Sequence, residues 1–329
     1  MGRGRHHRAQ ALTERVRGLL RRVDPTARRP LVLFPGRERD TPSEHSPESP
    51  SDLPAEGATL PPITVEATGT PSVPDEPPSG WSAPIRLSNG LTLAFAGSYP
   101  KDDQHPDSNE DAWAVHEPSG AVAVFDGATE SFAARRWVAI LARQWREHGS
   151  LDLESAQNTY ADSSPVALSW AQEQAATRGS FTTVAGLRRS EGQWSTLIVG
   201  DSAVLVVRDS EIVLARPHTS AADFASTPDA LASAADLRAE SALLLEHAQQ
   251  SMDLPSLPGA GTTGFLLATD AVAAWLLTDD LQERPSRLQA LLDCRTAQAW
   301  NALVVLERAT GRMKVDDATV LVLTLDEAS

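Results

Sequence analysis

Carboxylates stand at the ends of four short apolar segments whose composition is typical of β-strands. The four sites are Glu110-Asp111, Asp126-Gly127, Asp270 and Asp316. Carboxylates are poor strand residues and are costly to bury without a partner, so four such sites suggest that they share a hard cation. No His or Cys lies within these motifs, and an oxygen-only donor set selects Mg²⁺ or Mn²⁺ rather than zinc.

Strand direction explains how residues so distant in the sequence come together. Asp126 and Asp270 follow their apolar runs, whereas Glu110 and Asp316 precede theirs. In antiparallel neighbours the beginning of one strand lies beside the end of the next, so we expect all four sites on one rim. Taken singly, each acid is also what a solvated strand end or a turn carries. Taken together, they predict a pair of ions that activates a bridging water for in-line displacement at phosphorus.

The elements that must position this rim are short strands interrupted by pairs of helices. We expect strands over 84–87, 91–95, 112–115, 121–125, 182–187, 195–199, 203–207, 212–215, 264–268 and 319–325. We expect helices over 131–147, 164–179, 271–277, 285–292 and 296–308, with a further amphipathic stretch near 230–246. Asn89-Gly90 between two strands predicts a hairpin. The order predicts an α+β fold, a four-layer αββα sandwich of two mainly antiparallel sheets flanked by helices.

Three regions of different composition divide the chain. Residues 1–40 carry eleven Arg against four acids, and residues 9–23 have the spacing of a basic amphipathic helix. Such a helix docks to an anionic membrane surface or an acidic partner, or rests on the chain's own acidic domain. Residues 41–85 are rich in Pro, Ser and Glu, which predicts a disordered linker. Residues 86–329 have the pattern of a compact domain.

Charge and composition exclude several classes of function. The formal net charge is −15, and because residues 1–40 contribute +7 and residues 41–85 contribute −7, the domain from 86 onward carries the whole −15. A domain that acidic is not expected to bind nucleic acid. No apolar stretch is long enough to span a membrane, and no secretory signal is evident. The single cysteine, Cys294, fits a reducing cytoplasm and a place in the core.

The motifs resemble those of the metal-dependent protein phosphatase 2C family in a divergent bacterial form. The resemblance covers residues 86–325 and rests on five motifs in family order. They are Asn109-Glu110-Asp111-Ala112-Trp113, Val122-Ala123-Val124-Phe125-Asp126-Gly127, Val199-Gly200-Asp201-Ser202, Leu267-Ala268-Thr269-Asp270 and Asp316-Asp317-Ala318-Thr319-Val320. The resemblance implies a serine/threonine phosphatase with two Mn²⁺ or Mg²⁺ ions, phosphorylated proteins as substrates and a kinase as a counterpart.

The resemblance also implies a role for each acidic residue. Asp126 bridges both ions and Gly127 offers its carbonyl oxygen. Asp270 and Asp316 complete the shell of one ion, and Glu110, with Asp111 beside it, acts on the other. Asp201 holds a weaker third ion or is simply a turn residue.

The chain departs from the family where the substrate phosphate is held. Many members carry an arginine shortly before the first motif, whereas this chain has Gln104 to Ser108 there. The phosphate clamp is therefore missing or is supplied by Lys101, Arg135 or Arg136. Its absence favours an alternative, a weak or inactive pseudophosphatase that binds a phosphoprotein or kinase. His105 and His116 are either proton donors to the leaving group or scaffold.

Overall fold

The computed structural model describes residues 84–128, 131–163, 176–225, 227–252 and 263–325. The expected N-terminal helix, the linker up to residue 83 and most of the helix expected over 164–179 lie outside the described residues. Within the described ranges, no helix combines the length and the apolar character that a membrane crossing requires.

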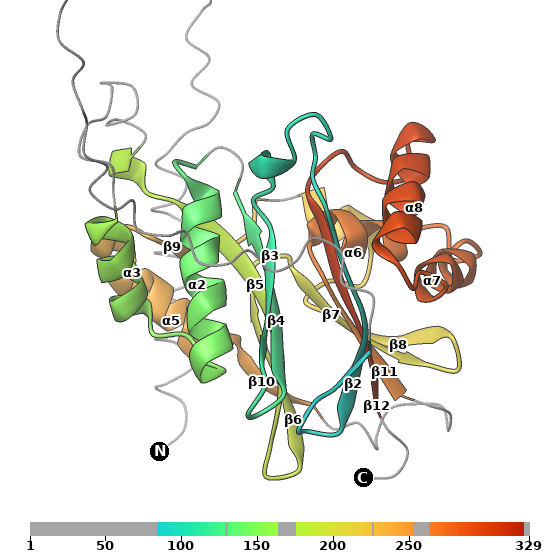
Figure 1. Ribbon diagram of the computed structural model, residues 1–329, viewed down its shortest axis with the longest axis horizontal. Helices are drawn as coiled ribbons and strands as arrows, with labels where there is room; N and C mark the ends of the chain where they lie inside the picture. The colour runs from blue at the N-terminus through green and yellow to red at the C-terminus, as the bar shows by residue number, and fades with distance from the viewer. Residues whose placement is uncertain (1–83, 129–130, 164–175, 226, 253–262, 326–329) are drawn as a thin grey trace, which may run out of the picture. The chain divides into compact units, whose positions relative to one another are not determined.

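Two antiparallel sheets form the centre of the domain (Figure 1). The first contains β1 (Ile85–Arg86), β2 (Leu91–Tyr99), β7 (Ala203–Arg208), β8 (Glu211–Arg216), β11 (Thr263–Ala268) and β12 (Ala318–Leu325), in the order β1-β2-β12-β11-β7-β8. The second contains β3 (Ala112–His116), β4 (Ala121–Gly127), β5 (Phe181–Ser190), β6 (Gln193–Val199), β9 (Leu231–Ala232) and β10 (Gln249–Met252). Its order is β10-β6-β5-β4-β3, with β9 paired to β5. The predicted antiparallel arrangement is confirmed.

Alternating side chains build a core between the sheets and another on each outer face. In β12, Leu321 and Leu323 point into the inter-sheet core, where Phe265 and Leu267 of β11 join them. The intervening Val320 and Val322 point to the helices instead. Because both faces are covered, these strands are apolar at nearly every position, which is why they appear in the sequence as continuous runs.

Helices cover both outer faces. On the first sheet lie α6 (Asp270–Leu276), α7 (Arg284–Leu292) and α8 (Ala297–Ala309), and on the second lie α2 (Ala134–His148), α3 (Leu153–Asp162) and α5 (Arg238–Ala248) (Figure 1). Trp300 of α8 is fully buried on one face, and Trp137 of α2 on the other. The layers are therefore helix, sheet, sheet, helix, as the sequence predicts.

Some elements differ from the sequence-based expectation. The chain forms α3 where we expected none, capped by Asp152, whose carboxylate accepts a hydrogen bond from the Ser155 amide (3.2 Å). The stretch near 230–246 is not one helix, because Leu231 and Ala232 pair with β5 before the short 3₁₀ turn Ala235–Leu237 begins. Two further 3₁₀ turns span Pro106–Ser108 and Ala221–Ala225.

The hairpin at Asn89-Gly90 is confirmed. Gly90 has a φ of 83°, which glycine adopts without a steric penalty. The Leu87 amide donates to the Leu91 carbonyl (2.7 Å), closing the turn between β1 and β2.

Candidate metal centre

The strand registers bring the predicted acidic sites to one rim of the sandwich. In the second sheet Ala112 lies opposite Phe125, so Asp111 and Asp126 flank the same end of the β3–β4 pair. In the first sheet the Thr269 amide donates to the Thr319 carbonyl (3.0 Å), which places Asp270 beside the residues that lead into β12. The convergence expected from strand direction is what the structure shows.

Asp126 is surrounded electrostatically by other carboxylates. It is the sixth residue of β4 and sits opposite Thr183 in β5, with its own carbonyl accepting from the Thr182 hydroxyl (2.7 Å). Burial raises the pKa of Asp126 well above its usual range, and the charges of neighbouring carboxylates raise it further. Those neighbours are Asp111, Asp270, Asp201 and Asp316. Five carboxyl groups from five separate motifs of the chain thus share one electrostatic environment.

Asp111 has one satisfied and one unsatisfied oxygen. Its Oδ2 accepts a hydrogen bond from the Thr269 hydroxyl (2.9 Å), whereas its Oδ1 is buried and has no hydrogen-bond partner among the described residues. Burial, followed by the charge of Asp317, raises the pKa of Asp111 well above its usual range. A buried carboxylate oxygen without a donor is costly unless a cation meets it.

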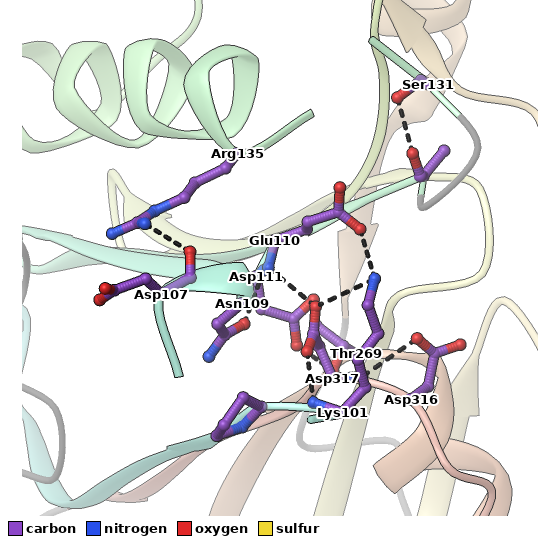
Figure 2. Close-up of polar contacts among 12 residues, drawn as sticks. Lys101, Asp107, Asn109, Glu110, Asp111, Ser131, Arg135, Thr269, Asp316 and Asp317 are labelled. Carbon is purple, nitrogen blue, oxygen red and sulfur yellow. Dashed lines mark hydrogen bonds and ion pairs between the residues drawn. The ribbon is translucent and has the colours of Figure 1, made fainter. Parts of the chain in front are cut away.

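Asp317 fixes the loops that carry the other acids. Its side chain is buried and accepts hydrogen bonds from the amides of Lys101 (2.6 Å) and Glu110 (2.8 Å) (Figure 2). Asn109 completes the arrangement, because its Oδ1 accepts from the Asp111 amide (2.9 Å) and its Nδ2 donates to Ser98 (2.9 Å). No separate role was predicted for Asp317. Its place directly after Asp316 in the closing motif was the available signal.

Glu110 is paired with an ammonium group. The Nζ atom of Lys101 lies 2.6 Å from Glu110 Oε2 and 4.0 Å from Asp317 Oδ2 (Figure 2). Partial burial lowers the pKa of Lys101. The hydrogen bond to Glu110 and the negative charge of Glu110 outweigh that effect and raise the pKa above its usual value. Lys101 was one of the three candidates for binding the substrate phosphate, but in the structure its ammonium group pairs with Glu110.

A second ammonium group, that of Lys314, was not predicted and bridges two of the predicted ligands. The Nζ atom of Lys314 lies 3.0 Å from Asp270 Oδ2 and 2.7 Å from Asp316 Oδ2. Partial burial lowers the pKa of Lys314, but the hydrogen bond to Asp316 and the charge of Asp270 raise it overall. Its place two residues before Asp316 is the only signal that the sequence offered.

Gly127 and Asp201 lie beside this cluster as well. A Cβ atom on Gly127 would stand 2.8 Å from the Glu110 carbonyl oxygen, so only glycine lets β4 approach the first motif this closely. Asp201 is buried in the turn between β6 and β7, and burial together with the charge of Asp270 raises its pKa to about 6. Asp201 is therefore close enough to Asp270 for the two charges to interact, whereas a solvent-exposed turn residue would be screened from the rim.

The remaining phosphate-clamp candidates differ in where they lie. Arg135 donates to the carbonyl of Asp107, in the loop that leads to the first motif (Figure 2). Arg136 stacks on the Tyr160 ring at 4.2 Å and donates to the carbonyls of Ser163 and Tyr160, so it serves the α2–α3 contact. Of the two arginines, Arg135 is the one that contacts the loop before the first motif.

Neither histidine lies in the cluster. His105 is on the exposed loop, where its Nδ1 pairs with Asp102 (2.7 Å). His116 is the last residue of β3 and bonds to Ser119 (2.7 Å), roughly 13 Å along the strand from Ala112. The scaffold interpretation fits His116, and the single cysteine, Cys294, is buried as expected.

The donor set fits a hard cation, although the carboxylates are not arranged around one. Within the described ranges, no group of three or more His, Cys, Asp or Glu side chains is placed so that it could hold an ion as it stands. Glu110, Asp270 and Asp316 are directed at ammonium groups instead. The unsatisfied Asp111 Oδ1 and the crowded carboxylate of Asp126 are oxygen donors of the kind that Mg²⁺ and Mn²⁺ prefer.

Several solved structures resemble the chain. A bacterial serine phosphatase is 14% identical over 71% of this chain and 98% of its own, with a TM-score of 0.44. The Mycobacterium tuberculosis serine/threonine phosphatase PstP/Ppp is 17% identical over 70% of this chain and 97% of its own, with a TM-score of 0.40. RsbX in complex with magnesium is 13% identical over 75% of this chain and 100% of its own, with a TM-score of 0.39.

No family model matches the sequence, and no curated protein matches it. The neighbours are of the kind that the motifs resemble, and the double sheet flanked by helices is the architecture that this resemblance implies. At these identities and TM-scores the likenesses carry no argument about activity, which depends on the carboxylates of the rim.

Proposed function

We propose that the chain is a metal-dependent phosphatase that removes phosphate from phosphoserine and phosphothreonine in proteins. The observation that carries the proposal is the gathering of Asp111, Asp126, Asp270 and Asp316 on one rim, with more carboxylates than the neighbouring lysines neutralise. The order of the five motifs along the chain supports the same reaction class.

The residues that would hold two Mg²⁺ or Mn²⁺ ions are Glu110, Asp111, Asp126, Asp270 and Asp316, with the Gly127 carbonyl and, for a weaker third ion, Asp201. When bound, such ions activate water and stabilise the charge that develops on a transferring phosphoryl group.

The chain's own residues prepare this rim. Burial penalises the charged forms of Asp111 and Asp126, so both carboxylates gain from any cation that reaches them. Thr269 orients Asp111 through its hydroxyl, and Asp317 fixes the backbone of Glu110. Arg135, at the edge of the loop before the first motif, is the residue that we assign to the substrate phosphate.

Turnover by the Asp126→Asn variant tests the proposal. The full chain is expected to hydrolyse an aryl phosphate and phosphopeptides in Mn²⁺ and to lose this activity in EDTA. Asp126→Asn is expected to lower kcat by about 10²-fold or more, the order that removal of a charge-stabilising group produces. The matched control is Asp162→Asn, the same change on an exposed residue of α3. Activity that survives both EDTA and Asp126→Asn contradicts the proposal.

A specific observation favours a second candidate, a protein that binds phosphoproteins without hydrolysing them. Lys101 already pairs with Glu110, and Lys314 pairs with both Asp270 and Asp316, so the rim has internal cations. Saturable phosphopeptide binding by calorimetry, with no turnover at any Mn²⁺ concentration, is the result that this candidate predicts.

The proposed substrates imply the partners. They are phosphorylated proteins and, through them, a serine/threonine kinase. We place this activity in the cytoplasm because the chain's single cysteine is unpaired and buried. The docking role of residues 1–40 stays a prediction.

A further inference from the structure

Lysine is rare in this chain, and both lysines lie on the carboxylate cluster. The sequence holds 29 Lys and Arg residues, and only Lys101 and Lys314 are lysines. Their ammonium groups contact Glu110, Asp270 and Asp316, three of the predicted metal ligands. Nearly all of the chain's positive charge is carried by arginine. At these carboxylates it is carried instead by lysine, whose ammonium group is more compact than a planar guanidinium.

Lys314 occupies the position between two ligands that one ion is expected to share. Its Nζ atom lies 3.0 Å from Asp270 and 2.7 Å from Asp316, so one positive charge is shared by two acids from different segments, the start of α6 and the turn before β12. Lys101 does not duplicate this arrangement, because it contacts Glu110 and lies near Asp317.

The Lys314 side chain is exposed enough to swing away from the two acids while the backbone on either side of it stays fixed. Its side chain is 58% exposed, whereas those of Asp270 and Asp316 are 13% and 26% exposed, so the ammonium group reaches the pair from the solvent side. The preceding residue, Met313, is anchored through its amide to the Glu307 carbonyl (3.1 Å), and Arg308 donates to the carbonyl of Asp316. The four-carbon stem of lysine is therefore the movable part of this segment.

We propose that Lys314 is a built-in competitor of the divalent ion. Its ammonium group holds the Asp270–Asp316 pair when no metal is bound, and an ion enters this half of the cluster by displacing it. The inference rests on the proposed function for the metal-ligand roles of the two acids. Under this inference, Lys314, which is not a metal ligand, sets the affinity of Asp270 and Asp316 for the ion.

Calorimetric titration of the full chain with MnCl₂ tests this inference. Lys314→Met is expected to bind Mn²⁺ about tenfold more tightly or better, because a positive charge this close to a carboxylate changes its affinity for a competing cation by at least that factor. Lys314→Gln serves as a second neutral variant if the methionine variant folds poorly.

Arg295→Met is the matched control. It removes one positive charge from an exposed residue whose guanidinium donates to the carbonyls of Leu292 and Cys294 and not to the cluster. Its Mn²⁺ affinity is expected to stay within about threefold of that of the parent chain, since an exposed charge that is not in contact is largely screened. An equal gain in Arg295→Met and Lys314→Met overturns the inference, because the effect would then be one of net charge.

Thermal unfolding gives a readout that does not depend on turnover. In EDTA, Lys314→Met is expected to unfold at a lower temperature than the parent, since Asp270 and Asp316 then repel each other without a cation. Saturating Mn²⁺ is expected to raise its unfolding temperature by more than it raises that of the parent. An unchanged unfolding temperature in EDTA, or an equal shift with Mn²⁺, overturns the inference.

The two proposals fail in different ways. Tighter Mn²⁺ binding by Lys314→Met with no hydrolysis by either protein supports the competition and contradicts the phosphatase activity. Hydrolysis by the parent, with Mn²⁺ affinity unchanged or weaker in Lys314→Met, supports the activity and overturns the competition. Absence of Mn²⁺ binding by both proteins also overturns the competition.

Discussion

At the scale of single residues, Asp126 shows that concentrating negative charge on the rim destabilises the fold. Four other carboxyl groups raise its pKa, and within the described residues no lysine or arginine forms an ion pair with its side chain. An acid in such a place costs folding free energy whenever no cation is bound. Functional sites often retain such a cost.

Asp126→Asn is therefore expected to stabilise the chain in EDTA while it removes activity. The unfolding temperature should rise by about 2–4 °C, the shift that roughly 1 kcal/mol produces in a domain of this size. Differential scanning calorimetry of the two proteins in EDTA measures the change, with Asp162→Asn as the control for an exposed acid. A lower unfolding temperature for Asp126→Asn would mean that Asp126 stabilises the metal-free fold.

The acids of the site were predictable from the sequence, and the lysines were not. Asp126, Asp270 and Asp316 each stand at one end of an apolar strand pattern, so each leaves a local signal. Lys314 lies in a loop, where lysine is ordinary, and only the approach of α6 to the turn before β12 reveals its partners. The sequence did not distinguish Arg135 from the other two candidates for binding the substrate phosphate. The structure distinguishes it from Arg136, because Arg135 contacts the loop before the first motif and Arg136 contacts Ser163.

At the scale of elements, α8 holds the segment that carries Lys314 and Asp316. Glu307 of α8 is buried, and its carboxylate accepts from Trp275 of α6 (2.9 Å) and from Arg312 (2.8 and 2.6 Å). Burial raises the pKa of Glu307, but the hydrogen bonds from Arg312 and Trp275 outweigh this and hold it below its usual value. The ionised carboxylate thus joins α6, α8 and the loop that follows.

The depressed pKa predicts how this junction responds to pH. A carboxyl group whose pKa is lowered by folding contributes stability above its unfolded pKa, near 4.5, and loses it as the pH falls through the folded value. Glu307→Gln is expected to lower the unfolding temperature by a few degrees at pH 7, and the difference from the parent should shrink below about pH 4.5. Thermal unfolding of both proteins between pH 7 and pH 3 tests this. A difference that does not change with pH would show that Glu307 acts through packing alone.

Strand patterns predicted most elements but not all of their limits. The runs of β4, β11 and β12 are apolar on both faces, so their positions were evident from the sequence. β2 extends beyond the expected 91–95 to Tyr99, because it continues to pair with β12 up to Ala318. The two-residue strand β9 has no pattern of its own and depends on its pairing with β5.

At the scale of the whole domain, the rim exists because two sheets are packed together. Glu110, Asp111 and Asp126 lie at one end of the β3–β4 pair in one sheet, whereas Asp270 and Asp316 lie at one end of the β11–β12 pair in the other. The large apolar core between the sheets fixes the separation of these strand ends. Neither sheet alone presents the full donor set, so the proposed metal centre is a property of the sandwich.

Anomalous scattering from a crystal of the full chain grown in Mn²⁺ tests this account most directly. We expect a manganese peak at bonding distance from an Asp126 carboxylate oxygen, with the Lys314 ammonium group displaced from the Asp270–Asp316 pair wherever an ion contacts that pair. A second peak roughly 3.5–4 Å from the first is expected for a two-ion site. Manganese found only away from the rim, or a rim without manganese at saturating concentration, would contradict the central claim that these carboxylates form a metal centre.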